Sequence, residues 1–185
     1  ATNSEPGPSL CATTYGLILT FTRSAAQTNF GVLSSTAVTT STPNIVLTSA
    51  TNAVGGYTVN IQGTGSGSGT ASGLYSASKT KLIASTSGNL DASIGTEGYG
   101  MQASVTNGTP TLNTSDWDPT QGGRNATWVG QIVRNATKIV YSSSGPTVVG
   151  TDHQVTTSYL ANISTTTVAS NDYRDILTFT MSAVW

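Results

Sequence analysis

Charged side chains are scarce in this chain, and their scarcity excludes several classes of partner. Only 8% of its 185 residues are charged, against about 25% in an average soluble protein. Seven Lys and Arg are spread along the length, and the formal net charge is -1. Such a surface has no basic stripe that could neutralise phosphates. The sequence therefore predicts neither a nucleic acid nor an anionic membrane as a partner.

Sulfur and imidazole ligands are scarcer still. A single cysteine, Cys11, excludes an internal disulfide. One His, one Cys and two Glu are too few to supply a zinc site. Asp116 and Asp118, with Asn113 nearby, offer oxygens that calcium could use, but the EF-hand spacing is missing. We therefore predict no metal and no cofactor.

Catalytic constellations are missing as well. His153 follows Asp152, and serines are abundant, yet no Gly-x-Ser-x-Gly elbow positions a nucleophile. We interpret His153 as a solvent-exposed residue at the beginning of a strand. The prediction is a protein without enzymatic activity. No apolar run reaches the roughly 18 residues that would span a bilayer.

Alternation of apolar and hydroxyl side chains is what the sequence has in abundance, since about a third of its residues are Ser or Thr. At the C-terminal end, residues 154–163 and 177–182 alternate with the period of two that is typical of half-buried strands. The connection between them holds Ser170, Asn171 and Asp172, which favour turns. We expect these two strands to pair with each other in antiparallel fashion.

Further strands are predicted along the rest of the chain. Residues 14–23 alternate strongly, and residues 45–62 are interpreted as a hairpin around Gly55 and Gly56. Shorter candidates lie at residues 82–84, 99–105 and 138–142, and near Val148. Roughly eight to ten short strands without a sustained helical pattern predict an all-β, antiparallel β-sandwich, either Ig-like or jelly-roll-like.

Domain limits and a core follow from this pattern. Residues 1–23 are predicted to form an N-terminal arm with a candidate donor strand, and residues 24–185 the sandwich domain. The predicted core consists of the largest side chains on the buried faces: Tyr57, Val59, Ile61, Met101, Tyr159, Ile163, Leu177 and Phe179.

Two loops stand out. Residues 63–73 are almost entirely Gly, Ser and Thr, which predicts a solvated loop. Residues 106–131 lack a period and contain Trp117 and Trp128, whose rings would either seal the end of the core or stack on sugars. Asn-x-Ser/Thr acceptors for N-glycosylation occur at Asn107, Asn113, Asn125, Asn135 and Asn162.

A resemblance to a known group rests on three segments: Tyr159–Ile163, Tyr173–Ser182 and Asn52–Val59. They resemble secreted bacterial β-sandwich surface proteins related in pattern to WxL-type wall-associated domains. The Trp-x-Leu signature itself is not matched, because Trp128 is followed by Val and Gly, and Trp117 by Asp and Pro. The resemblance implies a non-enzymatic, extracellular role at the cell surface.

The N-terminal strand suggests what that role is. Tyr15, Leu17, Leu19 and Phe21 share one face of residues 14–23. A terminal strand of this kind can complete the sheet of a neighbouring subunit, and the resulting contact is heterologous and produces a fibre. The prediction is thus a pilus-like homopolymer assembled by strand donation, with self as the main partner. The alternatives are a strand that pairs within its own sheet, and a monomeric adhesin or wall-associated domain that binds surface glycans.

Overall fold

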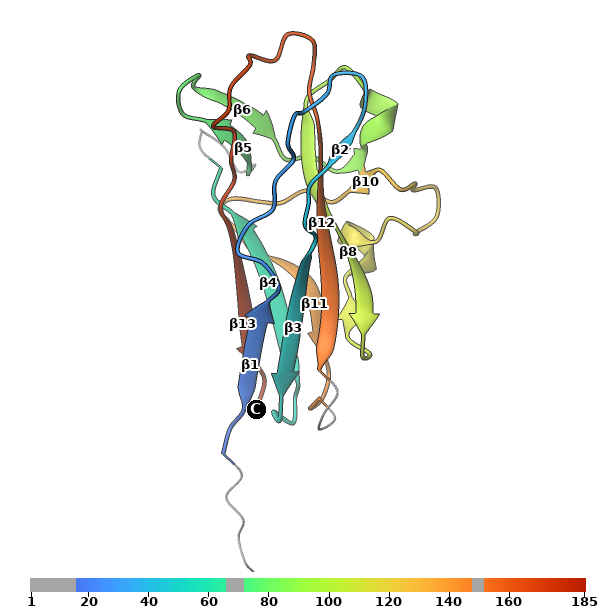
Figure 1. Cartoon of the computed structure of the whole chain (residues 1–185). Coiled ribbons are helices and arrows are strands. Elements are labelled where there is room, and N and C mark those ends of the chain that lie inside the picture. Colours follow the sequence, from blue (N-terminus) through green and yellow to red (C-terminus); the bar gives the residue numbers. More distant parts are fainter. Residues whose placement is uncertain (1–15, 66–71, 148–151) are drawn as a thin grey trace, which may run out of the picture.

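The computed structural model describes residues 16–65, 72–147 and 152–185, and these form two facing antiparallel sheets (Figure 1). The strands are β1 (Leu19–Arg23), β2 (Thr39–Thr40), β3 (Ile45–Thr51), β4 (Tyr57–Gly63), β5 (Gly73–Ser76), β6 (Lys81–Ala84), β7 (Gly88–Asn89), β8 (Gly98–Asn107), β9 (Thr111–Leu112), β10 (Trp128–Val129), β11 (Lys138–Ser143), β12 (His153–Asn162) and β13 (Leu177–Ala183). A 3-10 helix, η1 (Leu90–Ser93), and one helical turn, α1 (Thr114–Trp117), complete the described elements. The predicted all-β sandwich is confirmed.

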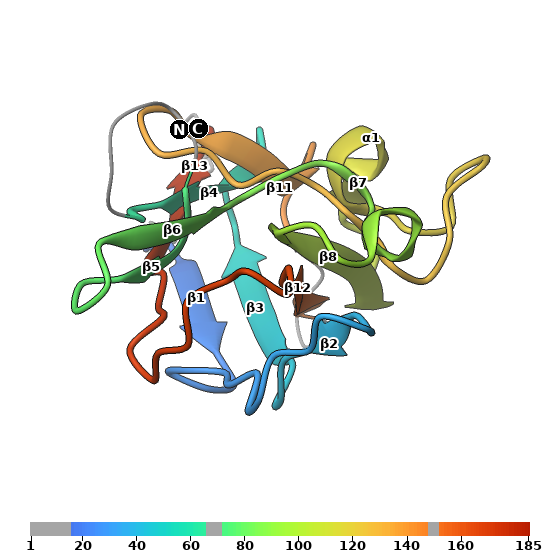
Figure 2. The same cartoon turned by 90° about the horizontal axis from the view of Figure 1, so that it is seen from above.

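The first sheet has β12 at its centre. β3 and β2 pair with successive parts of one edge of β12, β8 pairs with the other edge, and β1 extends the sheet beyond β3. The second sheet has the order β13-β4-β11-β9. Seen from above, β13 and β4 lie on one layer, β1 and β3 on the other, and β1 and β13 are on the same side of the sandwich (Figure 2). Two small pairs, β5 with β6 and β7 with β10, lie outside the main sheets.

Two strand pairings were predicted: a hairpin over residues 45–62, and a pairing of residues 154–163 with residues 177–182. Both are wrong, although all four strands exist. β3 and β4 belong to different sheets, so residues 52–56 cross between the layers and do not form a hairpin turn. β12 and β13 are likewise in opposite sheets. A period of two identifies which face of a strand is buried, and this face is the same whether the next strand lies beside it or opposite it.

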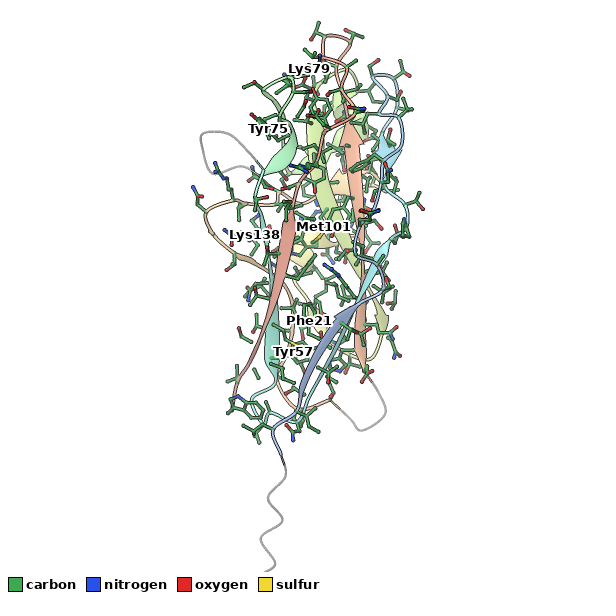
Figure 3. The ribbon with its side chains drawn as sticks, turned by 60° about the vertical axis from the view of Figure 1, so that its left-hand side comes forward. Phe21, Tyr57, Tyr75, Lys79, Met101 and Lys138 are labelled. Carbon is green, nitrogen blue, oxygen red and sulfur yellow. The ribbon has the colours of Figure 1, made fainter. Side chains whose placement is uncertain are left out.

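The core lies between the two inner faces. Every second residue of β3 and of β4 is buried, and side chains fill the space between the sheets, with Tyr57 and Met101 among them (Figure 3). Of the eight predicted core residues, five are fully buried: Tyr57, Val59, Ile61, Met101 and Tyr159. The other three, Ile163, Leu177 and Phe179, are only partly buried against this core.

Several hydroxyl groups inside the sandwich are paired with one another or with the backbone. The Ser49 and Tyr141 hydroxyls, one from each sheet, are 2.6 Å apart. The hydroxyl of Thr157 donates to the backbone oxygen of Ile45 at 3.1 Å. Pairing removes most of the cost of burying these groups, which explains how a chain so rich in Ser and Thr can form a core.

The segment between β8 and β11 covers one end of the core. Trp117 is fully buried, and a β-carbon on Gly130 would come within 2.1 Å of the backbone oxygen of Asp116. Gly130 bridges to Met101 of β8. The absence of a side chain at this position lets the segment lie close against the sheet.

Removing a large side chain from the centre of the core tests this packing. We expect Ile61→Ala to lower the free energy of unfolding by about 2–5 kcal/mol, since Ile61 is 0% exposed and the neighbouring strands hold the cavity open. Thr180→Ala, on the exposed face of β13, should change it by less than about 0.5 kcal/mol. Urea unfolding measures the free energy of unfolding of both variants. Equal losses would contradict the assignment of Ile61 to the buried face of β4 and of Thr180 to the exposed face of β13.

Candidate functional site

One long side of the sandwich is not closed. Among the described residues, β1 pairs only with β3, and β13 pairs only with β4 along residues 177–183, so within this part of the chain each presents a free edge on the same side of the molecule (Figure 1). We call the space between these two edges the seam. Its neighbours in the interior are the fully buried residues of β3 and β4.

Side chains that point into the seam are incompletely buried. Leu19 and Phe21 lie opposite the buried Thr51 and Ser49 of β3, so they face inward, yet Leu19 is 47% exposed. On β13 the inward-facing residues are Leu177, Phe179, Met181 and Ala183. All four are of intermediate exposure. These positions are less buried than the inward-facing residues of β3 and β4, which are all buried.

The upper part of the seam widens into a cavity of about 680 Å³. Apolar and aromatic residues dominate its walls, among them Phe30, Leu33, Tyr99, Tyr159, Ile163 and Phe179. Phe30 and Tyr99 meet edge to face, with ring centroids 6.2 Å apart. The loop before β13 and the loop after β1 form the remaining walls. This composition suits an apolar occupant.

Asp175 is the principal acidic group beside this cavity. Its carboxylate accepts hydrogen bonds from the Ser72 hydroxyl and from the backbone amides of Gly65, at 2.8 Å, and Thr64, at 3.2 Å. Burial raises the pKa of Asp175, and these hydrogen bonds oppose the rise. Asp175 precedes β13, Thr64 and Gly65 follow β4, and Ser72 precedes β5. The carboxylate therefore links these three segments at one end of the seam.

The opposite end of the molecule carries an exposed apolar cluster, which we call the apolar pole. Its members and their exposed fractions are Leu17 at 74%, Ile18 at 54%, Val54 at 81%, Val184 at 52% and Trp185 at 58%. Hydrogen bonds bring the three segments that carry these residues side by side. The amide of Gly55 donates to the backbone oxygen of Val184, and the side chain of Asn52 bonds to the backbone of residues 16 and 18. Five exposed apolar side chains at one place form a patch of the kind that marks interaction sites in many proteins.

The predicted donor residues are divided by the structure. Leu17 and Leu19 are exposed, whereas Phe21 packs against the protein's own core. Tyr15 lies outside the described residues. Residues 19–23, predicted to belong to an N-terminal arm, pair as β1 with β3 of the same chain.

His153 is buried, contrary to the prediction that it is exposed. It is 6% exposed, and its Nδ1 lies 2.7 Å from the hydroxyl of Tyr57. Gly108 leaves room for the imidazole, since a β-carbon there would lie 2.5 Å from the ring. This environment holds the ring between the two sheets. The sequence gives little signal for it, because His153 is flanked by the polar residues Asp152 and Gln154.

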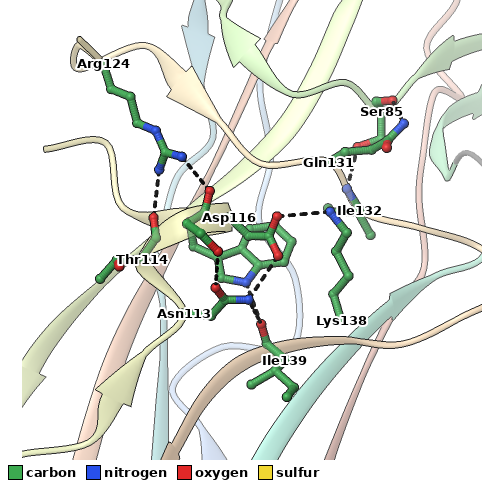
Figure 4. Close-up of polar contacts among 11 residues, drawn as sticks. Ser85, Asn113, Thr114, Asp116, Arg124, Gln131, Ile132, Lys138 and Ile139 are labelled. Carbon is green, nitrogen blue, oxygen red and sulfur yellow. Dashed lines mark hydrogen bonds and ion pairs between the residues drawn. The ribbon is translucent and has the colours of Figure 1, made fainter. Parts of the chain in front are cut away.

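The acidic and tryptophan residues of the long loop are engaged internally. Asp116 accepts from Asn113 at 2.9 Å and pairs with Lys138 at 3.3 Å (Figure 4). Trp117 donates to the oxygen of Ile139 at 2.7 Å. Asp118 accepts from the amide and hydroxyl of Thr120. Across residues 16–65, 72–147 and 152–185, no three His, Cys, Asp or Glu side chains are grouped to hold a metal.

Trp128, the other tryptophan of this loop, is covered by an arginine. The Arg124 guanidinium lies 4.0 Å from the centre of the Trp128 ring and donates to the oxygens of Thr114 and Asp118. Trp117 is fully buried, and Arg124 occupies one face of the Trp128 ring. The structure therefore places Trp117 as a seal over the core.

The five glycosylation acceptors differ in accessibility. Asn107, Asn125 and Asn135 are exposed, and Asn113 is half buried. Asn162 is 1% exposed, and its amide nitrogen donates to the oxygens of Leu90 and Ser93, each at 3.1 Å. In the folded chain this nitrogen is not accessible for modification.

Comparisons with known proteins give no relative: no family model matches the chain, and neither a curated protein nor a solved structure matches it. Among the described helices, none has the length and apolar character needed to cross a membrane. The seam and the apolar pole are therefore interpreted from their own geometry.

The buried histidine predicts a dependence of stability on pH. Burial lowers the pKa of His153, while Asp152 acts in the opposite direction. The unfolded chain therefore takes up a proton more readily than the folded one. The contribution of His153 to the free energy of unfolding should be complete above about pH 6.5 and should be lost as the pH falls through the lowered pKa.

Urea unfolding of the wild type and His153→Gln between about pH 7.5 and 5 measures this contribution. The difference between the two proteins should shrink as the pH falls, because the wild type alone loses stability through this group. Asp175 titrates in both proteins, so its effect cancels in the difference. Parallel pH profiles would show that His153 titrates normally in the folded state.

Proposed function

We propose that this protein is a non-enzymatic, extracellular structural subunit of a cell-surface filament, and that subunits join through donation of the N-terminal strand. The observation that supports the proposal is the apolar pole, where the chain leading into β1 exposes Leu17 and Ile18 beside Val54, Val184 and Trp185. In the described part of the chain this cluster is open to water. Covering each large apolar side chain contributes about 1.5–3 kcal/mol.

The remaining surface suits dense packing of identical subunits. With a net charge of -1 and only 8% charged residues, neighbouring copies repel one another weakly. The apolar pole and the seam are different surfaces at different places on the molecule. A contact between them is heterologous, so it extends into a fibre unless the rotation between subunits closes a ring.

The adhesin alternative has less support. Glycan binding was expected to use Trp117 and Trp128, but the first ring is buried and the second lies beneath Arg124. Asp116 and Asp118 are occupied by partners within the same loop. No described feature of this loop favours sugar recognition over its role as a cover for the core.

Electron microscopy and sedimentation of the full chain test the proposal. We expect fibres in the wild type, and in Leu17→Asp/Ile18→Asp at least a tenfold higher concentration for assembly, since the lost burial of two side chains exceeds about 1.4 kcal/mol. Thr20→Asp/Thr22→Asp places the same charges at exposed positions of β1 and should assemble nearly as the wild type does. A wild-type chain that stays monomeric at millimolar concentration would contradict the proposal.

A further inference from the structure

We infer that the seam is an acceptor site for an extended segment of a second copy, and that this segment is the chain N-terminal to Leu19. The inserted segment lies as an additional strand between β1 and β13, while each subunit keeps its own β1 paired with β3. The inference rests on the proposed function but specifies what is donated and where it binds. It differs from an exchange in which β1 itself leaves its sheet.

The seam offers both of the interactions that an added strand needs. The free edges of β1 and β13 supply backbone donors and acceptors. The exposed Leu19 and the half-buried Phe21, Phe179 and Met181 supply an apolar floor. Both interactions run along the length of β13, which at about 3.4 Å per residue is roughly 23 Å long.

The segment before Leu19 has matching chemistry and length. Between Glu5 and Arg23 no residue is charged, so nothing in this stretch resists burial in an apolar seam. In an extended strand Cys11, Tyr15 and Leu17 lie on one face. The twelve residues from Pro6 to Leu17 would span about 40 Å when extended, which exceeds the length of β13.

Hydrogen bonds at the apolar pole direct this segment away from the seam of its own subunit. The amide of Ile18 donates to the side-chain oxygen of Asn52 at 2.8 Å, and the Asn52 amide nitrogen donates to the oxygen of Gly16 at 2.8 Å. The hydroxyl of Thr51 donates to the oxygen of Ile18 at 2.9 Å. Residues 16–18 thus continue the line of β1 beyond the end of β3. Insertion of residues 16–18 themselves into the seam of their own subunit would break these bonds, which favours a second copy as the acceptor for this part of the segment.

A cysteine scan along β13 tests this arrangement, because the native Cys11 supplies the other thiol. Single cysteines are placed at the inward-facing Leu177, Phe179 and Met181, and at the outward-facing neighbours Thr178, Thr180 and Ser182, which are matched controls. Each full-length variant is oxidised under assembly conditions and separated on a non-reducing gel. A disulfide forms only when the two α-carbons come within about 7 Å.

We expect intermolecular disulfides to follow a period of two along β13. At least one inward position should give a yield tenfold above its outward neighbours, and Cys11→Ser should abolish it. A yield without alternation, or a disulfide within one chain, would overturn the inference.

An assembly measurement separates this inference from the proposed function. Met181→Arg should block fibre formation, whereas Thr180→Arg on the opposite face should not, and thermal unfolding of both variants checks that they fold. Fibres that persist in Met181→Arg, with no disulfide at any inward position, would overturn the seam as the acceptor and leave the filament intact. Alternating disulfides in dimers that never extend into fibres would support the seam and contradict the filament.

Discussion

Burial between two facing sheets is the constraint on which this structure depends. Tyr57, Val59 and Ile61 from one sheet meet Leu47, Val155 and Tyr159 from the other, and all are almost completely removed from water. A sandwich needs strands along its whole perimeter to seal this space. At the seam the perimeter is incomplete, because β1 and β13 cover the core only partly. The partial exposure of the core at the seam therefore arises from the two main sheets themselves and not from a surface loop.

Polar groups within and around the core make this architecture compatible with an unusual composition. Ser49 and Tyr141 satisfy each other, as do Tyr57 and His153. Carboxylates serve as anchors for loops: Asp172 accepts from Ser76, Ser78 and Ser170, and these hydrogen bonds lower its pKa. Hydroxyl groups thus perform the connecting role that charged pairs perform in many proteins. The surface stays neutral as a result, and close approach of identical copies carries little electrostatic cost.

The sequence predicts the strands and their buried faces well because alternation is a local property. β3, β4, β12 and β13 were all expected near their observed positions. Strand partners were predicted wrongly, since nothing local separates a hairpin turn from a crossing between sheets. The five-residue link 52–56 and the longer link 163–176 both cross between layers.

The candidate site was predictable only in part. Leu17 and Leu19 are predicted from their alternation to belong to a donor strand; both are exposed, and their role in assembly stays a prediction. The seam itself was not predicted, because it depends on which two strands remain at the edges after all others have paired. Phe30 and Leu33 lie far from Tyr99 in the sequence, and only the folded chain brings them to one cavity. The burial of His153 depends similarly on Gly108, which no local pattern connects to it.

Hydrogen exchange at the backbone amides of β1 and β13 tests the central claim most directly, since it reports whether their free edges become paired. In dissociated subunits the amides of residues 19–23 and 177–183 that are not bonded to β3 or β4 should exchange quickly. In assembled protein the account predicts that these same amides become at least tenfold slower, while amides of β12 at the centre of the sheet change little. Unchanged exchange at both edges in assembled protein would contradict it.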